Sequence, residues 1–278
     1  ANGQMTDSNG VGGGFSYEDS YSSPKGKANY QGRFLNCHGY GNTGNNFFVT
    51  ADGVEINPTC TARASVYSDA TKPDASQQFG HGVAGISVRK FRCEATVEGN
   101  AKAGVKLLGA NSHFCEAEIG GYIKSNSQRG IDGQGVARLR VLPTVVVESN
   151  GLGPVANREG VYVGNTSLNV GGGTVYVDGG QISLNGGAAV KVEYANRALI
   201  SGVTGYNPGQ SGVTSAGIQI ANASLGLISH CMIDGGSSQS YVAQITSTTV
   251  GGIFNVSGRA ITGGANNGAG TKLTAVSA

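Results

Sequence analysis

The most constraining feature of this sequence is a phrase of alternating apolar residues that returns at a nearly fixed interval. A Gly or Ala followed by an apolar residue opens the phrase at Gly160, Ala189 and Gly217. The phrases read VYV, VKV and IQI, and Gly, Asn and Ser separate them. Strict alternation is typical of β-strands, and a fixed period of about 20–50 residues indicates a repeat architecture. We therefore predict that each phrase belongs to one coil of a parallel β-helix.

Composition supports an all-β chain and excludes several functions. The sequence has 48 Gly and 6 Pro in 278 residues, its charged fraction is 13%, and no stretch shows helical apolar periodicity. A net charge of +2 without a basic stripe argues against nucleic acid, and no apolar run is long enough for membrane insertion. The first residues lack a signal-peptide pattern, so we expect either a removed signal or a piece of a longer chain.

The expected organisation has three parts. We predict an irregular lead-in or cap over residues 1–45, the parallel β-helix over 46–264, and a polar C-terminal exit over 265–278. Four asparagines close successive phrases, and Asn suits sharp corners because it tolerates the left-handed conformation. Stacked at one corner, they are expected to form an amide ladder of Asn126, Asn150, Asn185 and Asn207.

The cysteines are expected to be structural. Cys37 and Cys60 are separated by almost the same interval as Cys93 and Cys115, and this interval matches the length of a coil. Each pair is therefore predicted to stack on adjacent coils as buried thiols. The total of 5 Cys is odd, which argues against a complete disulfide framework. There is no CxxC and the four histidines are scattered, so we predict no metal site and no cofactor.

The coils between 82 and 264 resemble the pectate-lyase-like superfamily of right-handed parallel β-helices. Phrases such as GVYVGN, VYVDGGQISLNGG and ALISGVTGYN carry the resemblance, although no catalytic motif of the family is present. The fold expected is thus all-β, a single-stranded right-handed parallel β-helix. The Gly-, Ser- and Asn-rich style is most similar to the central domain of phage tailspikes. That likeness implies an extracellular virion protein, a homotrimer, which binds and often cleaves bacterial surface polysaccharide. A secreted polysaccharide lyase and a non-enzymatic fibre segment remain as alternatives.

One outward column is a candidate substrate-binding surface. The residue between the two inward apolar side chains of each opening strand gives Lys106, Asp132, Tyr162, Lys191 and Gln219. Such a column places side chains about 4.8 Å apart, so a sugar chain laid along it meets hydrogen-bonding groups and one stacking ring. The alternative is an ordinary solvated face, on which the first two residues form a weak surface pair.

A cluster of carboxylates upstream is the candidate catalytic site. Aligning Cys93 with Cys115 places Glu94 beside Glu116, and Glu118 and Glu148 follow. Carboxylates one coil apart approach the ~5–5.5 Å separation of retaining glycosidases, and two coils apart the ~6.5–9.5 Å of inverting ones. A lyase instead needs a base near the sugar C5 and a cation to neutralise the sugar carboxylate. Four residues have side chains suited to these two roles. They are the cations Arg138, Arg140 and Lys124, and Tyr162.

Overall fold

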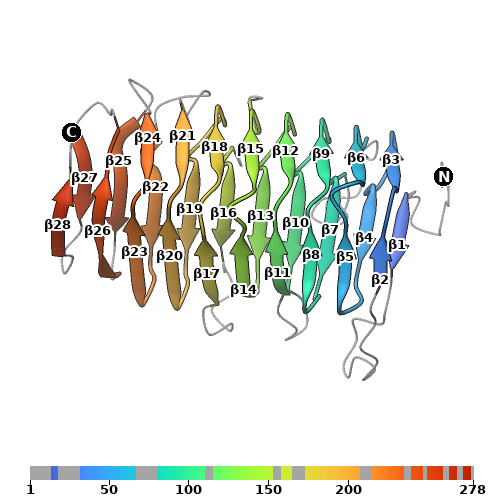
Figure 1. Cartoon of the computed structure of the whole chain (residues 1–278), viewed down its shortest axis with the longest axis horizontal. Helices are drawn as coiled ribbons and strands as arrows, with labels where there is room; N and C mark the ends of the chain where they lie inside the picture. Colours follow the sequence, from blue (N-terminus) through green and yellow to red (C-terminus); the bar gives the residue numbers. More distant parts are fainter. Residues whose placement is uncertain are drawn as a thin grey trace, which may run out of the picture.

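The computed structural model describes most of the chain, and the rest of the fold account concerns these residues alone. The described residues are 14–17, 32–66, 80–109, 115–152, 158–164, 173–206, 214–234, 239–246, 249–258, 263–267 and 272–276. Within them every regular element is a β-strand, and every strand pairs in parallel with strands of the neighbouring coils. The fold is the right-handed parallel β-helix expected from the sequence, and its coils follow one another along the long axis (Figure 1).

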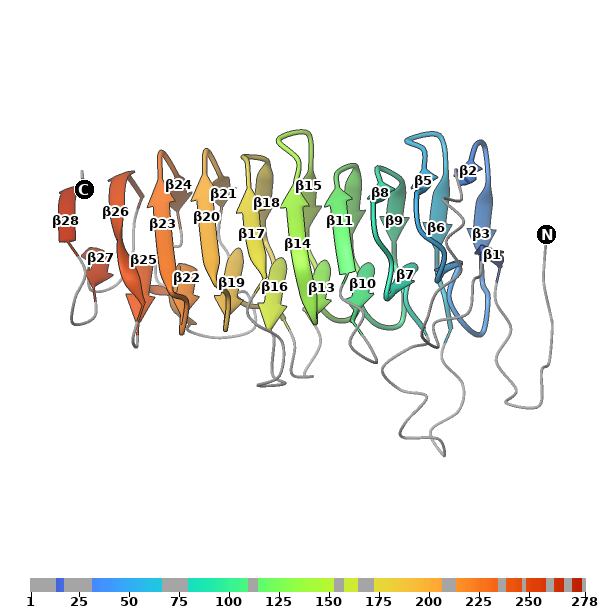
Figure 2. The same ribbon diagram turned by 90° about the horizontal axis from the view of Figure 1, so that it is seen from below.

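Three sheets form the walls of the helix. Each of the first eight coils contributes one strand to each wall in turn, and the described strands of the last two coils belong to the first two walls. Sheet A contains β1 (Phe15–Tyr17), β4 (Phe47–Val49), β7 (Val83–Ile86), β10 (Val105–Leu108), β13 (Ile131–Gln134), β16 (Val161–Gly164), β19 (Val190–Glu193), β22 (Thr214–Ala221), β25 (Gln239–Thr246) and β27 (Gly263–Asn267). Sheet B contains β2 (Gly32–Phe34), β5 (Val54–Ile56), β8 (Phe91–Cys93), β11 (Cys115–Ile119), β14 (Val136–Val141), β17 (Thr174–Val177), β20 (Arg197–Ser201), β23 (Leu225–Ser229), β26 (Val250–Val256) and β28 (Lys272–Val276). Sheet C contains β3 (His38–Tyr40), β6 (Thr61–Arg63), β9 (Thr96–Glu98), β12 (Tyr122–Lys124), β15 (Val146–Glu148), β18 (Gln181–Ser183), β21 (Thr204–Tyr206) and β24 (Met232–Asp234). In the view from below, the strands of sheet B run side by side along the molecule (Figure 2).

The interior is a stack of small apolar side chains, because alternate residues of each short strand point inward. The inward pairs predicted from the phrases are Val105 and Leu107, Val161 and Val163, Val190 and Val192, and Ile218 and Ile220. All of them have no solvent exposure. Burying such rows stabilises the fold by roughly 25 cal/mol per Å² of apolar surface. The repeat phrase is therefore the core of the helix.

The register of sheet A confirms the repeat. Paired positions there are Val83, Val105, Ile131, Val161, Val190 and Ile218. The coil that separates Val83 from Val105 is the shortest of this series, and the coil between Ile131 and Val161 is the longest. The variation falls in the connections between strands, so the strands stay aligned while the coils differ in length.

An asparagine ladder runs along the corner between sheets C and A. Each side-chain amide donates to the next side-chain oxygen, from Asn100 to Asn126 at 2.8 Å, to Asn150 at 2.8 Å and to Asn185 at 3.0 Å. The ladder predicted from the sequence is confirmed for Asn126, Asn150 and Asn185, which are all buried. It begins earlier than expected, since Asn46 donates to Asn100 at 2.9 Å. Asn207 lies outside the described residues.

Strand pairing extends past both boundaries expected for the helix. β1, β2 and β3 precede residue 46 and pair in register with β4, β5 and β6. At the other end β27 and β28 pair with β25 and β26, and most of their residues lie beyond 264, the expected C-terminal limit. The Gly- and Tyr-rich composition of the first segment hid very short strands, which do not extend far enough to show a period.

Candidate functional site

The outer face of sheet B carries a column of side chains that stands out by its charge. Its strands share an apolar–X–apolar triplet, and the middle residue of each triplet faces outward. We call these in-register middle residues the central column of sheet B. Its members are Arg33, Glu55, Arg92, Glu118, Arg140, Tyr176, Leu199 and Leu227. The sign of the charge alternates over the first five coils, and the column then becomes aromatic and aliphatic.

Ion pairs connect most of the charged part of the central column. Arg33 lies 2.9 Å from Glu55, Glu118 lies 3.6 Å from Arg92, and Glu118 lies 3.9 Å from Arg140. Side-chain exposures of 46% for Arg92 and 39% for Glu118 place these pairs at the surface. Exposed pairs of this kind contribute about 0–1 kcal/mol each, so their main effect is to hold the side chains in order.

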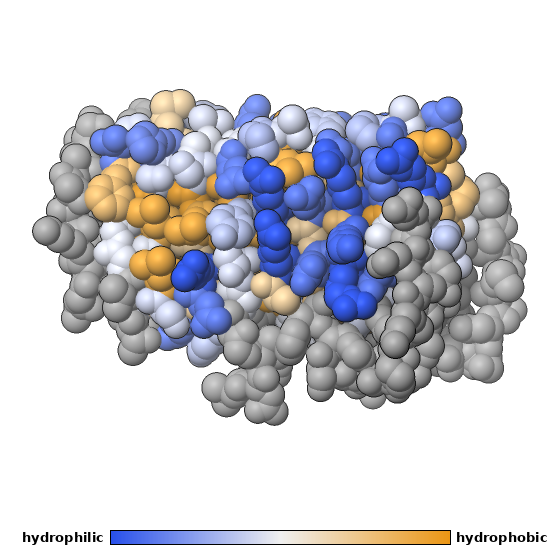
Figure 3. Space-filling model, turned by 60° about the horizontal axis from the view of Figure 1, so that its bottom comes forward, coloured by the Kyte–Doolittle hydropathy of each residue, from blue (hydrophilic) through white to orange (hydrophobic). Residues whose placement is uncertain are grey.

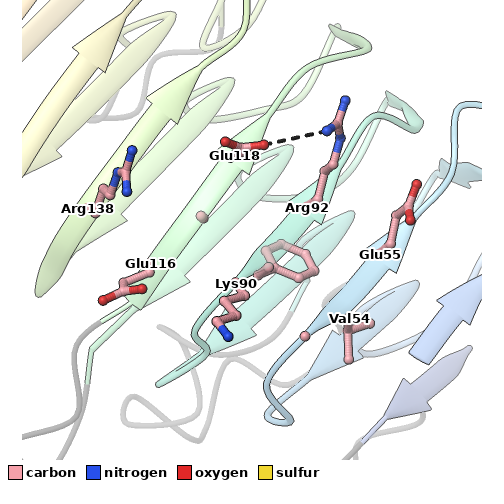
Figure 4. Close-up of a pocket in the computed structure, with 10 residues that line it drawn as sticks. Val54, Glu55, Lys90, Arg92, Glu116, Glu118 and Arg138 are labelled. Carbon is pink, nitrogen blue, oxygen red and sulfur yellow. Dashed lines mark ion pairs between the residues drawn. The ribbon is translucent and has the colours of Figure 1, made fainter. Parts of the chain in front are cut away.

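A groove of about 350 Å³ lies over this part of sheet B. Its lining comes from β5, β8, β11 and β14 and the turns before the first two strands. The residues that line it are Gly53, Val54, Glu55, Lys90, Phe91, Arg92, Glu116, Ala117, Glu118 and Arg138. Figure 4 shows their side chains, with one ion pair drawn among them, between Glu118 and Arg92.

Three charged residues of the groove are not neutralised. Glu116 is half-buried, and Lys90 and Arg138 are exposed at its two sides. Within the described part of the chain, none of the three side chains has an ion-pair or hydrogen-bond partner. Glu116 is in register with Arg138 on one side. On the other side it neighbours Lys90, which precedes the residue paired with Ala117. One free carboxylate is thus flanked by two free cations (Figure 4).

The polar groove ends where the apolar part of the central column begins. Figure 3 shows hydrophilic side chains gathered over the N-terminal half of the visible face and hydrophobic ones nearer the C-terminal end. Tyr176, Leu199 and Leu227 are half-buried members of this apolar part, and Leu225 beside them is 41% exposed. The charged members of the central column are therefore confined to its first five coils.

The predicted catalytic carboxylates do not converge on one point. The expected alignment of Cys93 with Cys115 is wrong, because Cys93 pairs with Ile119. That shift moves Glu94 to the position beside Gly120, away from Glu116, and Glu94 is held by Arg92 at 2.7 Å. The shift arises because the connections before β8 and β11 differ in length, so equal cysteine spacing does not mean equal register.

Glu148 lies on a different wall. It belongs to β15 of sheet C, is in register with Lys124, and accepts a hydrogen bond from the Tyr122 hydroxyl at 3.1 Å. Of the predicted catalytic set, only Glu116 and Glu118 line the groove. Arg138 lines it with them, and Arg140 lies beside it, bonded to Asp178 at 2.6 Å.

The predicted substrate-binding column of sheet A has the expected register but a different environment. Lys106, Asp132, Tyr162, Lys191 and Gln219 follow one another in consecutive pairs. The first three are buried, with exposures of 3% for Lys106 and 6% for both Asp132 and Tyr162. Lys106 and Asp132 therefore do not form the surface pair considered as the alternative.

Buried ion pairs and hydrogen bonds join this column to residues that flank it. Asp132 binds Lys106 at 2.7 Å and Arg129 at 3.1 Å. The Arg129 guanidinium also stacks on the Tyr162 ring, 3.4 Å from its centroid. Further links are Arg129 to Glu159 at 2.7 Å, the Tyr162 hydroxyl to Glu193 at 2.8 Å, and Lys191 to Glu193 at 2.9 Å. We call this connected set the sheet A network.

The electrostatics of the sheet A network follow from its burial. Burial lowers the pKa of Lys106 by more than the neighbouring Asp132 raises it. For Asp132, burial raises the pKa, but the charges of Lys106 and Arg129 outweigh it and leave the pKa below its ordinary value. Burial, together with the bond to Glu193, raises the pKa of Tyr162. The network is consequently a set of fixed charges with mutual partners, which suits a structural role.

Sequence reasoning missed several groove and network residues, and two reasons account for four of them. Glu55 and Arg92 occupy the middle of the triplets VEI and FRC, and aligning triplets in place of cysteines finds them. Lys90 and Arg129 lie in turns, at positions that strand periodicity does not reach. The triplet alignment is the signal in the sequence that locates the central column.

Two further properties bear on the kind of site. In the described ranges, no group of three or more His, Cys, Asp or Glu side chains is arranged to hold a metal ion. Nor does the described chain contain a helix long and apolar enough to cross a membrane.

Comparison with known proteins gives one structural likeness. No protein-family model matches the chain, and a comparison with characterised proteins by sequence finds no match. Among solved structures, the A-module of a mannuronan C-5 epimerase from Azotobacter vinelandii is similar, with 12% identity and a TM-score of 0.32. The alignment covers 88% of this chain and 81% of that module. With so low an identity and TM-score, the likeness carries no argument about this chain's activity.

Proposed function

We propose that this chain binds an acidic bacterial surface polysaccharide along the groove of sheet B and cleaves it by β-elimination. The observation that carries the proposal is the free carboxylate of Glu116 between the free cations Lys90 and Arg138 in an open groove. The groove crosses parallel strands spaced about 4.8 Å apart, a regular surface on which an extended polymer lies across successive coils.

The two cations account for binding. Arg138 presents a planar fork of donors at the surface that matches a sugar carboxylate in a bidentate fashion. Lys90, on the coil that precedes Glu116, offers a second positive charge. Neither cation has to leave a protein partner in order to bind the ligand. A neutral glycan gains nothing from these charges, so the groove favours a uronate-containing polymer.

The free carboxylate accounts for chemistry. In β-elimination, Glu116 takes the proton from C5 of a uronate, whose carboxylate is neutralised by Arg138. The electron pair of the C5–H bond forms the C4–C5 double bond, and the bond from C4 to the glycosidic oxygen breaks. The leaving oxygen takes a proton from water. A cation on the carboxylate stabilises the negative charge that develops there in the transition state.

The ion pairs of the central column favour elimination over hydrolysis. A glycosidase needs one carboxylic acid and one carboxylate on either side of the bond. Glu118 is shared between two arginines and Glu94 is bound to Arg92, which leaves Glu116 as the free carboxylate of the groove. The hydrolase expected as one alternative from the sequence thus has less support than the lyase.

The finer assignment follows the sequence resemblance. We place the chain in the virion, as an extracellular tailspike-type β-helix that acts as a homotrimer. The alternative is a glycan-binding fibre segment without catalysis, which the pairing of the other three groove charges, Glu55, Arg92 and Glu118, favours. A monomer in light scattering counts for a secreted lyase and against the tailspike.

The decisive experiment measures cleavage and binding separately. Purified protein is incubated with uronate-rich and with neutral bacterial polysaccharides, and the absorbance of the unsaturated uronate product is followed. We expect a rise with the acidic polymer alone. Glu116→Gln should abolish the rise while binding in affinity electrophoresis persists. Arg138→Gln should weaken binding at least about tenfold, because a charge-assisted hydrogen bond contributes about 1.5–3 kcal/mol.

The matched control is Glu148→Gln, which makes the same chemical change on sheet C, away from the groove. It should leave both cleavage and binding unchanged. Binding of acidic polymer without any product supports the fibre alternative. Loss of activity in the control equal to that in Glu116→Gln, or equal binding of neutral and acidic polymers, contradicts the site.

A further inference from the structure

Cys37 and Cys60 lie next to each other on the first two coils of the helix. They occupy the positions directly before the pairs His38–Thr61, Gly39–Ala62 and Tyr40–Arg63. The Thr61 amide donates to the Cys37 carbonyl at 3.0 Å. The stacking predicted from their spacing is thus confirmed, while Cys93 and Cys115 are out of register.

Hydrogen bonds on both sides of this pair fix its spacing. Before the cysteines, the Asn36 amide donates to the Thr59 hydroxyl at 3.1 Å. After them, besides the Thr61 amide, the His38 ring bonds the Thr61 hydroxyl at 2.9 Å. The two Cα atoms are held at the strand spacing of about 4.7–4.9 Å, which lies inside the roughly 4.4–6.8 Å range of disulfides.

The two thiols also point to the same place. Cys37 Sγ donates to the carbonyl of Leu35 at 3.4 Å, and Cys60 Sγ donates to the carbonyl of Phe34 at 3.1 Å. These carbonyls belong to consecutive residues, so both sulfur atoms converge on one turn. Both cysteines are present as free thiols.

The members of the pair differ in access to solvent. Cys37 is partly exposed, whereas Cys60 is fully buried. An accessible thiol is able to react with a small molecule, and a buried neighbour is able to displace that molecule from it. Burial raises the pKa of Cys37, and the neighbouring Cys60 adds to the increase, so its thiolate becomes more abundant toward alkaline pH.

We propose that Cys37 and Cys60 form an oxidisable dithiol, in which exchange with a low-molecular-weight disulfide yields a disulfide that joins the first two coils. The Cys37 thiolate attacks one sulfur of oxidised glutathione, and one reduced glutathione leaves. The Cys60 thiolate then attacks the Cys37 sulfur, and the second reduced glutathione leaves. The two protein thiols lose two electrons and two protons, and one glutathione disulfide gains them.

The link has a physical consequence because of where it lies. β3 is the edge strand of sheet C, paired with β6 on one side. A short terminal strand has hydrogen bonds to one neighbour, so it opens more easily than an inner coil. A disulfide at Cys37 closes a short loop and limits that opening.

The experiment incubates the folded protein with oxidised glutathione at pH 8 and counts free thiols after denaturation. We expect the count to fall from five to three, with peptide mapping showing a Cys37–Cys60 link and an upward shift of the melting temperature. Cys60→Ser should instead retain one glutathione on Cys37, and Cys37→Ser should take up none at Cys60. In these variants mass spectrometry measures the glutathione that is attached to each cysteine. The test therefore stays valid even if the disulfide changes folding.

Cys231→Ser is the matched control, since Cys231 is buried and distant in sequence from the pair. It should form the same link, with two free thiols left. An unchanged count of five thiols in the native protein overturns the proposal. A link between another pair, or between two chains, overturns it equally.

Discussion

Removing the charge of Asp132 should lower the free energy of unfolding by more than removing any single charge on the outer face of sheet B. Asp132 is the counter-ion of Lys106 at 2.7 Å and shares Arg129 at 3.1 Å, and all three side chains are at most 9% exposed. Asp132→Asn leaves Lys106 buried without its carboxylate. Breaking a buried pair by removing one partner costs about 3–5 kcal/mol. We expect a loss near the lower end of that range, because Arg129 keeps Glu159 at 2.7 Å.

The assay is urea unfolding followed by circular dichroism at pH 7 and 25 °C, with the midpoint compared between variants. Glu118→Gln is the control, because its ion pairs are exposed and should contribute at most about 1 kcal/mol. Lys106→Met combined with Asp132→Asn should recover most of the loss, since the uncompensated buried charge is then absent. If Asp132→Asn costs no more than Glu118→Gln, the sheet A network does not stabilise the fold as argued.

The same pair predicts a dependence on pH. The pKa of Asp132 is lowered in the folded chain from an ordinary value of 3.8. Its charge therefore stabilises the fold fully above pH 3.8, and this contribution disappears as the pH falls through the lower, folded value. The difference in urea midpoint between the wild type and Asp132→Asn should narrow in acid below that range. A difference that stays constant with pH in acid contradicts the assignment.

Three further predictions concern the helix itself. Burial lowers the pKa of Lys102 to about 8, so Lys102→Met should raise the melting temperature at pH 7. Above pH 8 the folded wild type loses this proton while the unfolded chain keeps it up to about 10.5, so the advantage of the variant should shrink over that range. Asn150→Ala should lower the free energy of unfolding by about 2–6 kcal/mol in urea titration, because the buried backbone N–H and the side-chain amide of Asn126 both lose the Asn150 oxygen, at about 1–3 kcal/mol for each. Gly130→Ala should destabilise by about 1–3 kcal/mol or more in the same assay, because a Cβ there would lie 2.4 Å from Val147 and 2.7 Å from the carbonyl oxygen of Gly160. Equal midpoints for Gly130→Ala and the wild type would mean that the neighbouring coils accommodate the added methyl group without loss of stability, which contradicts this prediction.

The sequence was sufficient for the fold because the inward residues repeat in every coil. Val161 and Val163 are followed by Val190 and Val192 at the same positions of the next coil, and all four are fully buried. A row of this kind has one satisfactory arrangement, in which the coils stack in parallel. The ends were placed less well, since β1 to β3 and β27 to β28 lie partly or wholly beyond the expected limits.

The sequence predicted the candidate site only in part. The reason is that the outward side chains do not repeat from coil to coil as the inward ones do. Glu116 and Arg138 were identified as chemistry-bearing residues and do line one groove. Glu148 was grouped with them, although it lies on sheet C. The sheet on which a residue lies depends on which strand of the coil contains it. Because the coils differ in length, the number of residues between a marker such as a cysteine and a given strand differs from coil to coil.

The charge order along the central column shows what spacing alone leaves out. Arg33, Glu55, Arg92, Glu118 and Arg140 alternate in sign, so each one faces opposite charges on its neighbouring coils. Displacing the column by one coil would bring like charges together, which is unfavourable for cross-strand neighbours. The alternation therefore favours the observed pairing of triplets, by about 0–1 kcal/mol for each exposed pair. Charge order in the triplets thus agrees with the register of sheet B, where the spacing of Cys93 and Cys115 gave a wrong one. It also separates paired carboxylates such as Glu118 from the free Glu116, which lies outside the alternation.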